Sequence, residues 1–329
     1  MLRLPPSRWV AYFSFALLLV STATFQLGAA ILAGIFSYTI LDSAHRKLAS
    51  HIRPFLARWL SLMIFTVTAV AAAWMFWRFI RQSITTLPDI LARVIPPLNE
   101  ISLRYGLDLP FENIHEFRHM ILEAVKENVS DISHASGILT KKFFHVLIGI
   151  FIAILHFMNE TKEEYHENLY DAFRKEFNEH AARFMQSFER VLGAQVIISA
   201  INTVLTAIFL IVLGFPYAPF LVPATFILGI LPIIGNVLSN TIIVCTALSL
   251  SPRHAVFSLC FLIVIHKGEY FLNSRIIGSS IRAPMWQTLL GILVGEVTLG
   301  VPGIVLAPAI LHYIREEMRA VAWPAEKNG

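Results

Sequence analysis

The stretch that decides the fold covers residues 223–312 and reads PATFILGILPIIGNVLSNTIIVCTALSLSPRHAVFSLCFLIVIHKGEYFLNSRIIGSSIRAPMWQTLLGILVGEVTLGVPGIVLAPAILH. Its apolar runs are interrupted at 232–235, 251–252, 278–284 and 300–302. Between these points almost every residue is Leu, Ile, Val, Ala or Phe. A segment that is apolar on every side is buried in protein or in lipid. Several such segments in one chain indicate lipid.

The composition of the whole chain agrees with this interpretation. Of 329 residues, 56% are apolar and only 15% are charged, with a net charge of +4. An average soluble protein has roughly 45–50% apolar residues, Gly included. The two cysteines, Cys245 and Cys260, fall inside apolar runs, where a thiol behaves as a small hydrophobic group. No disulfide is therefore expected.

The predicted fold class is an all-α polytopic membrane protein. It has about eight transmembrane helices, including short hairpins at both ends, and additional amphipathic interface helices. Five segments are predicted: 1–79, an N-terminal hairpin and a membrane span; 80–142, an extracytoplasmic amphipathic segment; 143–192, a span and a cytoplasmic amphipathic helix; 193–315, a membrane bundle; and 316–329, a cytoplasmic tail.

The first apolar region, 10–41, is flanked by basic residues on both sides, which favours a hairpin that enters the membrane and returns. A single long tilted helix is one alternative, and a cleaved signal peptide ending near Ala23 is another. Basic blocks at 1–9, 42–58, 267–282 and 315–327 predict that both termini are cytoplasmic.

Two amphipathic helices are predicted, at 111–132 and at 159–192, from apolar residues spaced three and four apart. The second could be a gate or an oligomer contact, or simply a helix packed on the bundle. Prolines are expected to divide the segment 80–142; they are Pro88, Pro96, Pro97 and Pro110. In the C-terminal half, spans are predicted at 193–213, 217–231, 233–250 and 254–266, followed by a hairpin of 285–299 and 303–314.

Glu296 is the first candidate for a functional group, because it lies in the C-terminal hairpin four residues before its break. A carboxylate within a membrane must pair, face water or titrate. Coupling to a proton or cation is one interpretation, and a carboxylate that reaches the interface at the hairpin tip is the other. Glu269 and His266, at the end of the preceding span, are the predicted titratable partners. A structural ion pair of Glu269 with Lys267 or Arg275 is the alternative.

Polar residues and helix breaks inside apolar runs complete the candidate transport pathway. Asn236 and Asn240 could face a polar pathway or bond to neighbouring helices. Breaks free backbone groups that transporters use in substrate sites. The breaks predicted to line the pathway are Pro232, Gly235, Gly300, Pro302 and Gly303.

A competing motif is the H-E-x-x-H pattern of His115, Glu116 and His119, which on a helix could bind zinc with the glutamate as general base. Arg118 lies inside the motif, where its charge would repel a metal, and no third ligand has a recognised spacing. We therefore predict no metal and no cofactor. Nothing in the sequence indicates a nucleic-acid surface.

The C-terminal half resembles the autoinducer-2 exporter family of bacterial membrane proteins, also called PerM-like permeases. The residues that carry the resemblance are LGFP at 213–216, LPIIGN at 231–236, EYFLNSRIIG at 269–278 and LGVPGIVLAPAI at 299–310. The sequence departs from the family at Ser274, where many members carry Pro.

The resemblance implies a bundle of membrane helices that exports a small signal molecule or exchanges sodium for protons, often as a homo-oligomer. We accordingly predict a non-enzymatic, multi-pass permease of the bacterial inner membrane. Its expected partners are the lipid bilayer, a small solute, a coupling cation (H+ or Na+) and further copies of the chain. The alternatives are a membrane scaffold or regulator without transport, and a membrane zinc protease.

Overall fold

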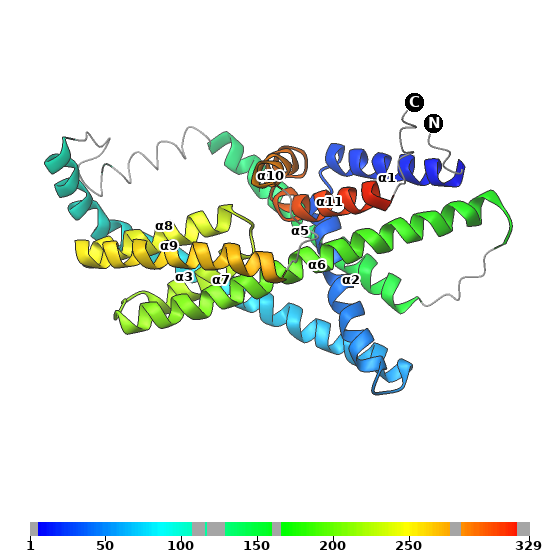
Figure 1. Cartoon of the computed structure of the whole chain (residues 1–329), viewed down its shortest axis with the longest axis horizontal. Helices are drawn as coiled ribbons and strands as arrows, with labels where there is room; N and C mark the ends of the chain where they lie inside the picture. Colours follow the sequence, from blue (N-terminus) through cyan, green and yellow to red (C-terminus); the bar gives the residue numbers. More distant parts are fainter. Residues whose placement is uncertain (1–5, 107–115, 117–128, 160–165, 277–283, 321–329) are drawn as a thin grey trace, which may run out of the picture. The chain divides into compact units, whose positions relative to one another are not determined.

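The computed structural model describes residues 6–106, 116, 129–159, 166–276 and 284–320 (Figure 1). No strand occurs among these residues, which confirms the predicted all-α class. The principal helices are α1 (Pro6–Thr24), α2 (Gly28–Ala49), α3 (Pro54–Tyr105), α5 (Val129–Met158), α6 (Leu169–Val212), α7 (Ala218–Gly229), α8 (Ile234–Leu250), α9 (Pro252–Ile276), α10 (Met285–Leu299) and α11 (Val301–Ala320).

Several helices are suited to a membrane. Three stretches of the described chain are long and apolar enough to cross one, namely α3, α6 and the part of α5 from Thr140. Shorter apolar helices occur at Trp9–Thr24, Ala218–Gly229, Ile234–Leu250 and Trp286–Leu299. Large apolar side chains cover helix surfaces, for example Phe151 (61% exposed) and Val264 (69% exposed). Exposed apolar surface of this extent is expected of a chain that contacts lipid.

The chain forms two compact units, each assembled from separated stretches of sequence. Unit 1 comprises residues 1–68, 140–193 and 280–329, and unit 2 comprises residues 69–139 and 194–279. Helices α3, α5 and α6 contribute to both units. The five segments predicted from the sequence are continuous stretches, whereas each of these units combines separated stretches. The boundaries of the five segments stay predictions.

In unit 1, α10 and α11 form the predicted C-terminal hairpin and lie side by side (Figure 1). Gly300 joins them in a left-handed conformation (φ 69°), which glycine adopts without strain. The two backbones approach closely where Gly295 faces Gly303, since a Cβ built at Gly295 would lie 2.6 Å from the Gly303 carbonyl oxygen. Two facing glycines therefore set the spacing of this hairpin.

The N-terminal apolar region consists of two helices rather than one. Helix α1 ends at Thr24 and α2 begins at Gly28, with Gln26 at φ 54° in the turn between them. This break excludes the single long helix considered from the sequence. Helix α2 meets the α10–α11 hairpin closely, because a Cβ at Gly28 would lie 2.9 Å from the carbonyl oxygen of Leu299.

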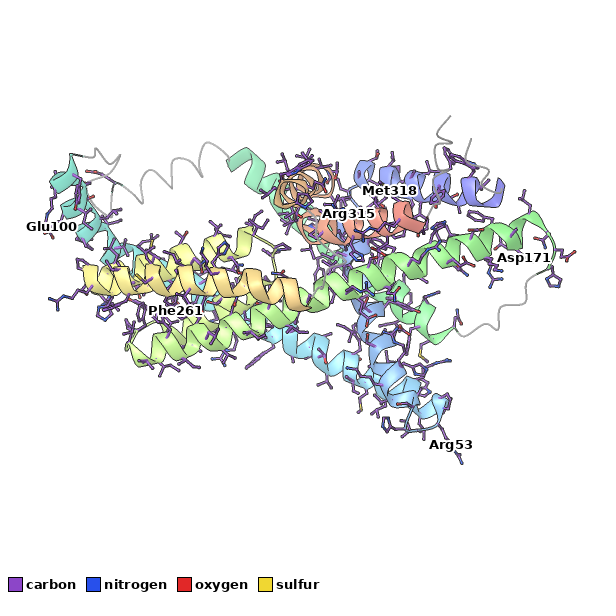
Figure 2. All side chains as sticks on the ribbon, viewed as in Figure 1. Arg53, Glu100, Asp171, Phe261, Arg315 and Met318 are labelled. Atoms are coloured by element: carbon purple, nitrogen blue, oxygen red, sulfur yellow. The ribbon has the colours of Figure 1, made fainter. Side chains whose placement is uncertain are left out.

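Unit 2 has an apolar core to which α3, α6, α7, α8 and α9 all contribute. Its buried residues are Ile90, Val94, Leu210, Phe215, Phe220, Leu221, Ala224, Ile243, Ala247 and Leu262. Helix α8 packs against both α7 and α9, and the α8–α9 pair is visible as two adjacent yellow helices in Figure 1. Phe209 and Phe261 stack with ring centroids 3.9 Å apart, which fixes α6 against α9 (Figure 2 labels Phe261).

The expectation that prolines divide the segment after residue 79 is wrong for three of them. Helix α3 continues through Pro88, Pro96 and Pro97 to Tyr105. Each proline removes its own N–H donor from the ladder, and its ring crowds the carbonyl group four residues earlier. Between the prolines, Ile90 and Val94 are 2% and 4% exposed, so burial of this face offsets the lost hydrogen bonds. Pro110 and most of the predicted helix 111–132 lie outside the described residues.

The predicted amphipathic helix 159–192 and the span 193–213 are one continuous helix, α6. It begins at Leu169 rather than Asn159 because Asn168 caps it: the Asn168 Oδ1 accepts the Asp171 backbone N–H at 2.8 Å. Asp171 in turn accepts the His166 backbone N–H at 2.9 Å, and this bond lowers the pKa of the Asp171 carboxyl. Figure 2 shows Asp171 at this end of α6. Gly193 costs only about 1 kcal/mol inside a helix, too little to break it.

Candidate functional site

The break between α7 and α8 in unit 2 is a tight, strained turn. The Ile234 N–H donates to the Pro232 carbonyl at 2.7 Å, and Ile233 between them has φ 65° and ψ −62°. This is the geometry of a γ-turn, which is rare, and a β-branched residue there is a backbone outlier. Strain of this kind costs on the order of 1–3 kcal/mol and gathers at functional sites.

Gly235 allows the chain to fold back at the same place. A Cβ on Gly235 would overlap the carbonyl of Leu228 in α7, so any other residue would push α8 away from α7. Gly235 is buried and Pro232 is half-buried. The structure thus gives both predicted break residues a defined role in one turn.

Side chains of α6 bond to the carbonyl groups at the end of α7. The Gln195 Nε2 donates to the Gly229 carbonyl at 2.7 Å, and the Ser199 hydroxyl donates to the Phe226 carbonyl at 2.9 Å. The last carbonyls of a helix have no partner within it, and an unbonded one is costly in lipid. These bonds hold the broken segment against a continuous helix.

One turn beyond the break, Asn236 bonds to the carboxylate of Glu269 on α9. The Asn236 Nδ2 lies 2.8 Å from Oε1 and 2.9 Å from Oε2 of Glu269. Asn202 of α6 is a further hydrogen-bonding neighbour of the same carboxylate and is only 8% exposed. Three helices of unit 2 therefore place two amides on one half-buried acid. We call Glu269, Asn236 and Asn202 the carboxylate–amide cluster.

The other predicted residues of this region lie near the cluster with different exposure. His266 is exposed on α9, one turn before Glu269, and interacts with it electrostatically. Asn240 is half-buried on α8, one turn after Asn236. Among the described side chains, Glu269 contacts amides rather than Lys267, so the proposed ion pair with Lys267 is absent there. The Arg275 side chain lies outside the described residues.

Glu296 belongs to unit 1, on α10, and its side chain is exposed. Its backbone carbonyl accepts the Gly300 N–H at 2.7 Å, which closes the last turn of α10. Gly303 is buried and Pro302 half-buried at the start of α11. The coupling role of Glu296 inferred from the sequence stays a prediction, and the structure does not add a polar partner for it among the described residues.

The H-E-x-x-H pattern falls almost entirely outside the described residues, which include Glu116 but neither histidine. Within the part of the chain that is described, no three His, Cys, Asp or Glu side chains are arranged to hold a metal ion.

Two features of this region could not be read from the sequence. The strained φ of Ile233 has no signal in its residue type, because isoleucine disfavours that conformation. The pairing of Asn236 with Glu269 joins residues 33 positions apart on two helices. Asn202 and Gln195 did carry a signal, since amides within apolar runs need partners.

The arrangement suits reversible binding of a small cation. A carboxylate in apolar surroundings is stabilised by a proton or a cation, and the amide donors stabilise its charged form when neither is bound. The helix break at Ile233, three residues before Asn236, supplies further polar backbone groups. The fold and this site together define a polytopic membrane protein with an acid at a helix break.

Comparison with known proteins agrees. The family model described as "AI-2E family transporter" matches residues 10–323, so the chain belongs to the AI-2E transporter family, which confirms the resemblance seen in the sequence. A relative is the protein named "Putative transport protein YdbI" of Bacillus subtilis (strain 168), 29% identical over 146 residues. That match covers 43% of this chain and 41% of the relative, which is less than half of each.

Proposed function

We propose that this membrane permease is an ion-coupled secondary transporter of the bacterial inner membrane and that Glu269 is its coupling carboxylate. The observation that carries the proposal is the carboxylate–amide cluster beside the strained turn at Ile233. Binding of a proton or sodium ion would neutralise the Glu269 carboxylate and change its hydrogen bonds with Asn236 and Asn202. The adjacent helix break is where the backbone could respond to this change.

The transported species is a small solute related to autoinducer-2, which is exported in exchange for H+ or Na+. The alternative is that the protein exchanges Na+ for H+ without a further solute. The family supports transport as the general function, and the two candidate cations follow from the chemistry of a single carboxylate. The protein would work as a homo-oligomer with both termini in the cytoplasm, as the basic blocks predict.

The test is transport into sealed vesicles that contain the purified full chain. A pH-sensitive dye inside the vesicles reports proton movement when Na+ or autoinducer-2 is added outside. Glu269→Gln keeps size and hydrogen bonding but cannot titrate, and we expect it to abolish cation-dependent flux. Glu100→Gln, at a side chain 75% exposed in solvent, is the matched control and should transport like wild type.

Glu296→Gln in the same assay separates the two candidate acids. If Glu269→Gln assembles and transports normally across the pH range, while Glu296→Gln loses its pH dependence, the coupling group is Glu296 and our assignment is wrong. Normal flux in both variants would refute carboxylate coupling at these two positions, whereas absence of any flux in the wild-type protein would favour a scaffold or regulator.

A further inference from the structure

A second buried polar cluster lies in unit 1, around His180 of α6. The imidazole is 0% exposed. Its Nδ1 atom lies 3.1 Å from the Arg183 Nη2, 3.0 Å from the Tyr313 hydroxyl of α11, and 3.4 Å from the Glu317 Oε2. We call these residues the His180 cluster. It shares no residue with the carboxylate–amide cluster, and the transport proposal does not use it.

The His180 cluster also holds helix α1. The Tyr12 hydroxyl of α1 donates to Glu317 Oε2 at 3.1 Å, and the Arg183 Nε lies 2.6 Å from Glu317 Oε1. The Tyr12 ring lies 4.6 Å from the His180 ring between centroids, and the Phe15 ring 6.1 Å. Glu317 thus links α1 to α6, and the imidazole forms part of the surface on which α1 rests.

The contacts of His180 Nδ1 influence the protonation state of the ring in opposite directions. A guanidinium group can only donate hydrogen bonds, so Nδ1 facing Arg183 must accept, and the Tyr313 hydroxyl can donate to the same atom. These two closer contacts favour a neutral ring that accepts at Nδ1, against the Glu317 carboxylate, which lies 3.4 Å from the same atom and favours the protonated ring. Protonation would turn Nδ1 into a donor facing the Arg183 donor and would place a positive charge on a fully buried ring beside that of the partly exposed Arg183.

Every element that packs on the ring contributes titratable or charged groups. These are Tyr12 from α1, Glu176 and Arg183 from α6, and Tyr313 and Glu317 from α11. Burial of the ring lowers the pKa of His180; Glu317 and Glu176 oppose this and Arg183 adds to it. The net effect is a lowered pKa of His180, in agreement with the two hydrogen-bond donors that face Nδ1.

We propose that the His180 cluster is a pH-sensitive latch that holds α1 on α6 and α11 when the imidazole is neutral and releases α1 when it is protonated. The sign follows from linkage. A histidine whose pKa is lower in the closed state than in the open state binds protons more readily when open. The latch is fully closed above the ordinary histidine pKa of about 6.5 and weakens as the pH falls below it.

Hydrogen–deuterium exchange of the full chain in lipid nanodiscs tests the latch. Protection of α1 amides is compared at about pH 7.5 and about pH 5.5, with labelling times scaled for intrinsic exchange, to bracket the histidine range. We expect α1 protection to fall by up to about tenfold at the lower pH, because pH 5.5 lies about one unit below the ordinary histidine pKa of about 6.5, while the α7 and α8 peptides keep theirs.

Three variants make the result specific. His180→Asn keeps an acceptor near the Nδ1 position but cannot titrate, so α1 should stay protected at both pH values. Tyr12→Phe removes the bond of α1 to Glu317 and should lower α1 protection at both, with the pH effect retained. His51→Asn, at an exposed histidine in the α2–α3 turn, should behave as wild type.

Two outcomes would overturn the proposal. One is wild-type α1 protection that does not change with pH. The other is a His180→Asn protein that loses α1 protection at low pH as wild type does. Because Tyr12→Phe leaves His180 in place, α1 protection equal to wild type in that variant would also refute the latch, even if His180→Asn fails to fold.

Discussion

Replacement of Gly303 by alanine tests how the α10–α11 hairpin is held together. The new Cβ would overlap the backbone carbonyl of Gly295, which is part of a helix and cannot rotate away as a side chain could. The helices must therefore move apart along their closest contact, where Ala307 also lies within 3.1 Å of a Cβ at Gly295.

The expected size of the effect follows from two opposing terms. Forcing an extra carbon into a packed contact typically costs about 1–3 kcal/mol. Alanine regains about 0.5–1 kcal/mol over glycine within a helix. We expect Gly303→Ala to lower the free energy of unfolding by about 0–2.5 kcal/mol, as the difference between these terms.

The assay is unfolding of the purified protein in mixed micelles by added SDS, followed by circular dichroism. Gly193→Ala is the matched control, because nothing lies within 4 Å of a Cβ at that position in α6, and it should be neutral or stabilising. Equal stability of the two variants would refute the idea that close backbone approach at Gly303 sets the hairpin spacing.

Other predictions concern the helix cap, the strained turn and the topology. Asn168→Ala should destabilise the start of α6 by about 1 kcal/mol, measured as faster amide exchange in its first turn. Because the pKa of Asp171 is lowered in the folded state, its contribution is present above the ordinary aspartate pKa and is lost as the pH falls through the folded value; amide exchange in the same turn should rise in acid. Ile233→Gly should relieve up to about 1–3 kcal/mol of backbone strain, and a loss of stability would indicate that packing of the isoleucine side chain outweighs it. A cysteine at position 108 should react with an impermeant reagent added to intact cells, and a cysteine at position 326 should not. The reverse pattern would invert the topology.

The sequence was sufficient for the fold class and for most helix breaks. Apolar runs ended by Pro and Gly placed the ends of α7, α8 and α10 within a few residues, because those two residue types act locally on the backbone. The prolines in α3 do not end the helix, since burial of Ile90 and Val94 outweighs their local effect on the backbone. Local patterns cannot report such tertiary contacts.

The candidate sites were less accessible to sequence reasoning than the fold. Glu269 and Asn236 were both selected as intramembrane polar residues, but their mutual contact depends on how α8 and α9 pack. The His180 cluster was missed, because His180 lies in a charged stretch where it resembles a surface residue. Its burial depends on α1 and α11, which are far away in sequence.

The length of the uninterrupted helix α3 limits how much of it can lie within the bilayer. Its 52 residues extend about 78 Å at 1.5 Å per residue, whereas the hydrocarbon layer is only about 30 Å thick. Pro88, Pro96 and Pro97 leave the carbonyl groups four residues earlier without their usual main-chain donors, and such groups need another donor or water. The first, apolar part of α3 is therefore the part suited to hydrocarbon, whereas the proline-containing part packs Ile90 and Val94 into the apolar core of unit 2, where neighbouring helices cover it.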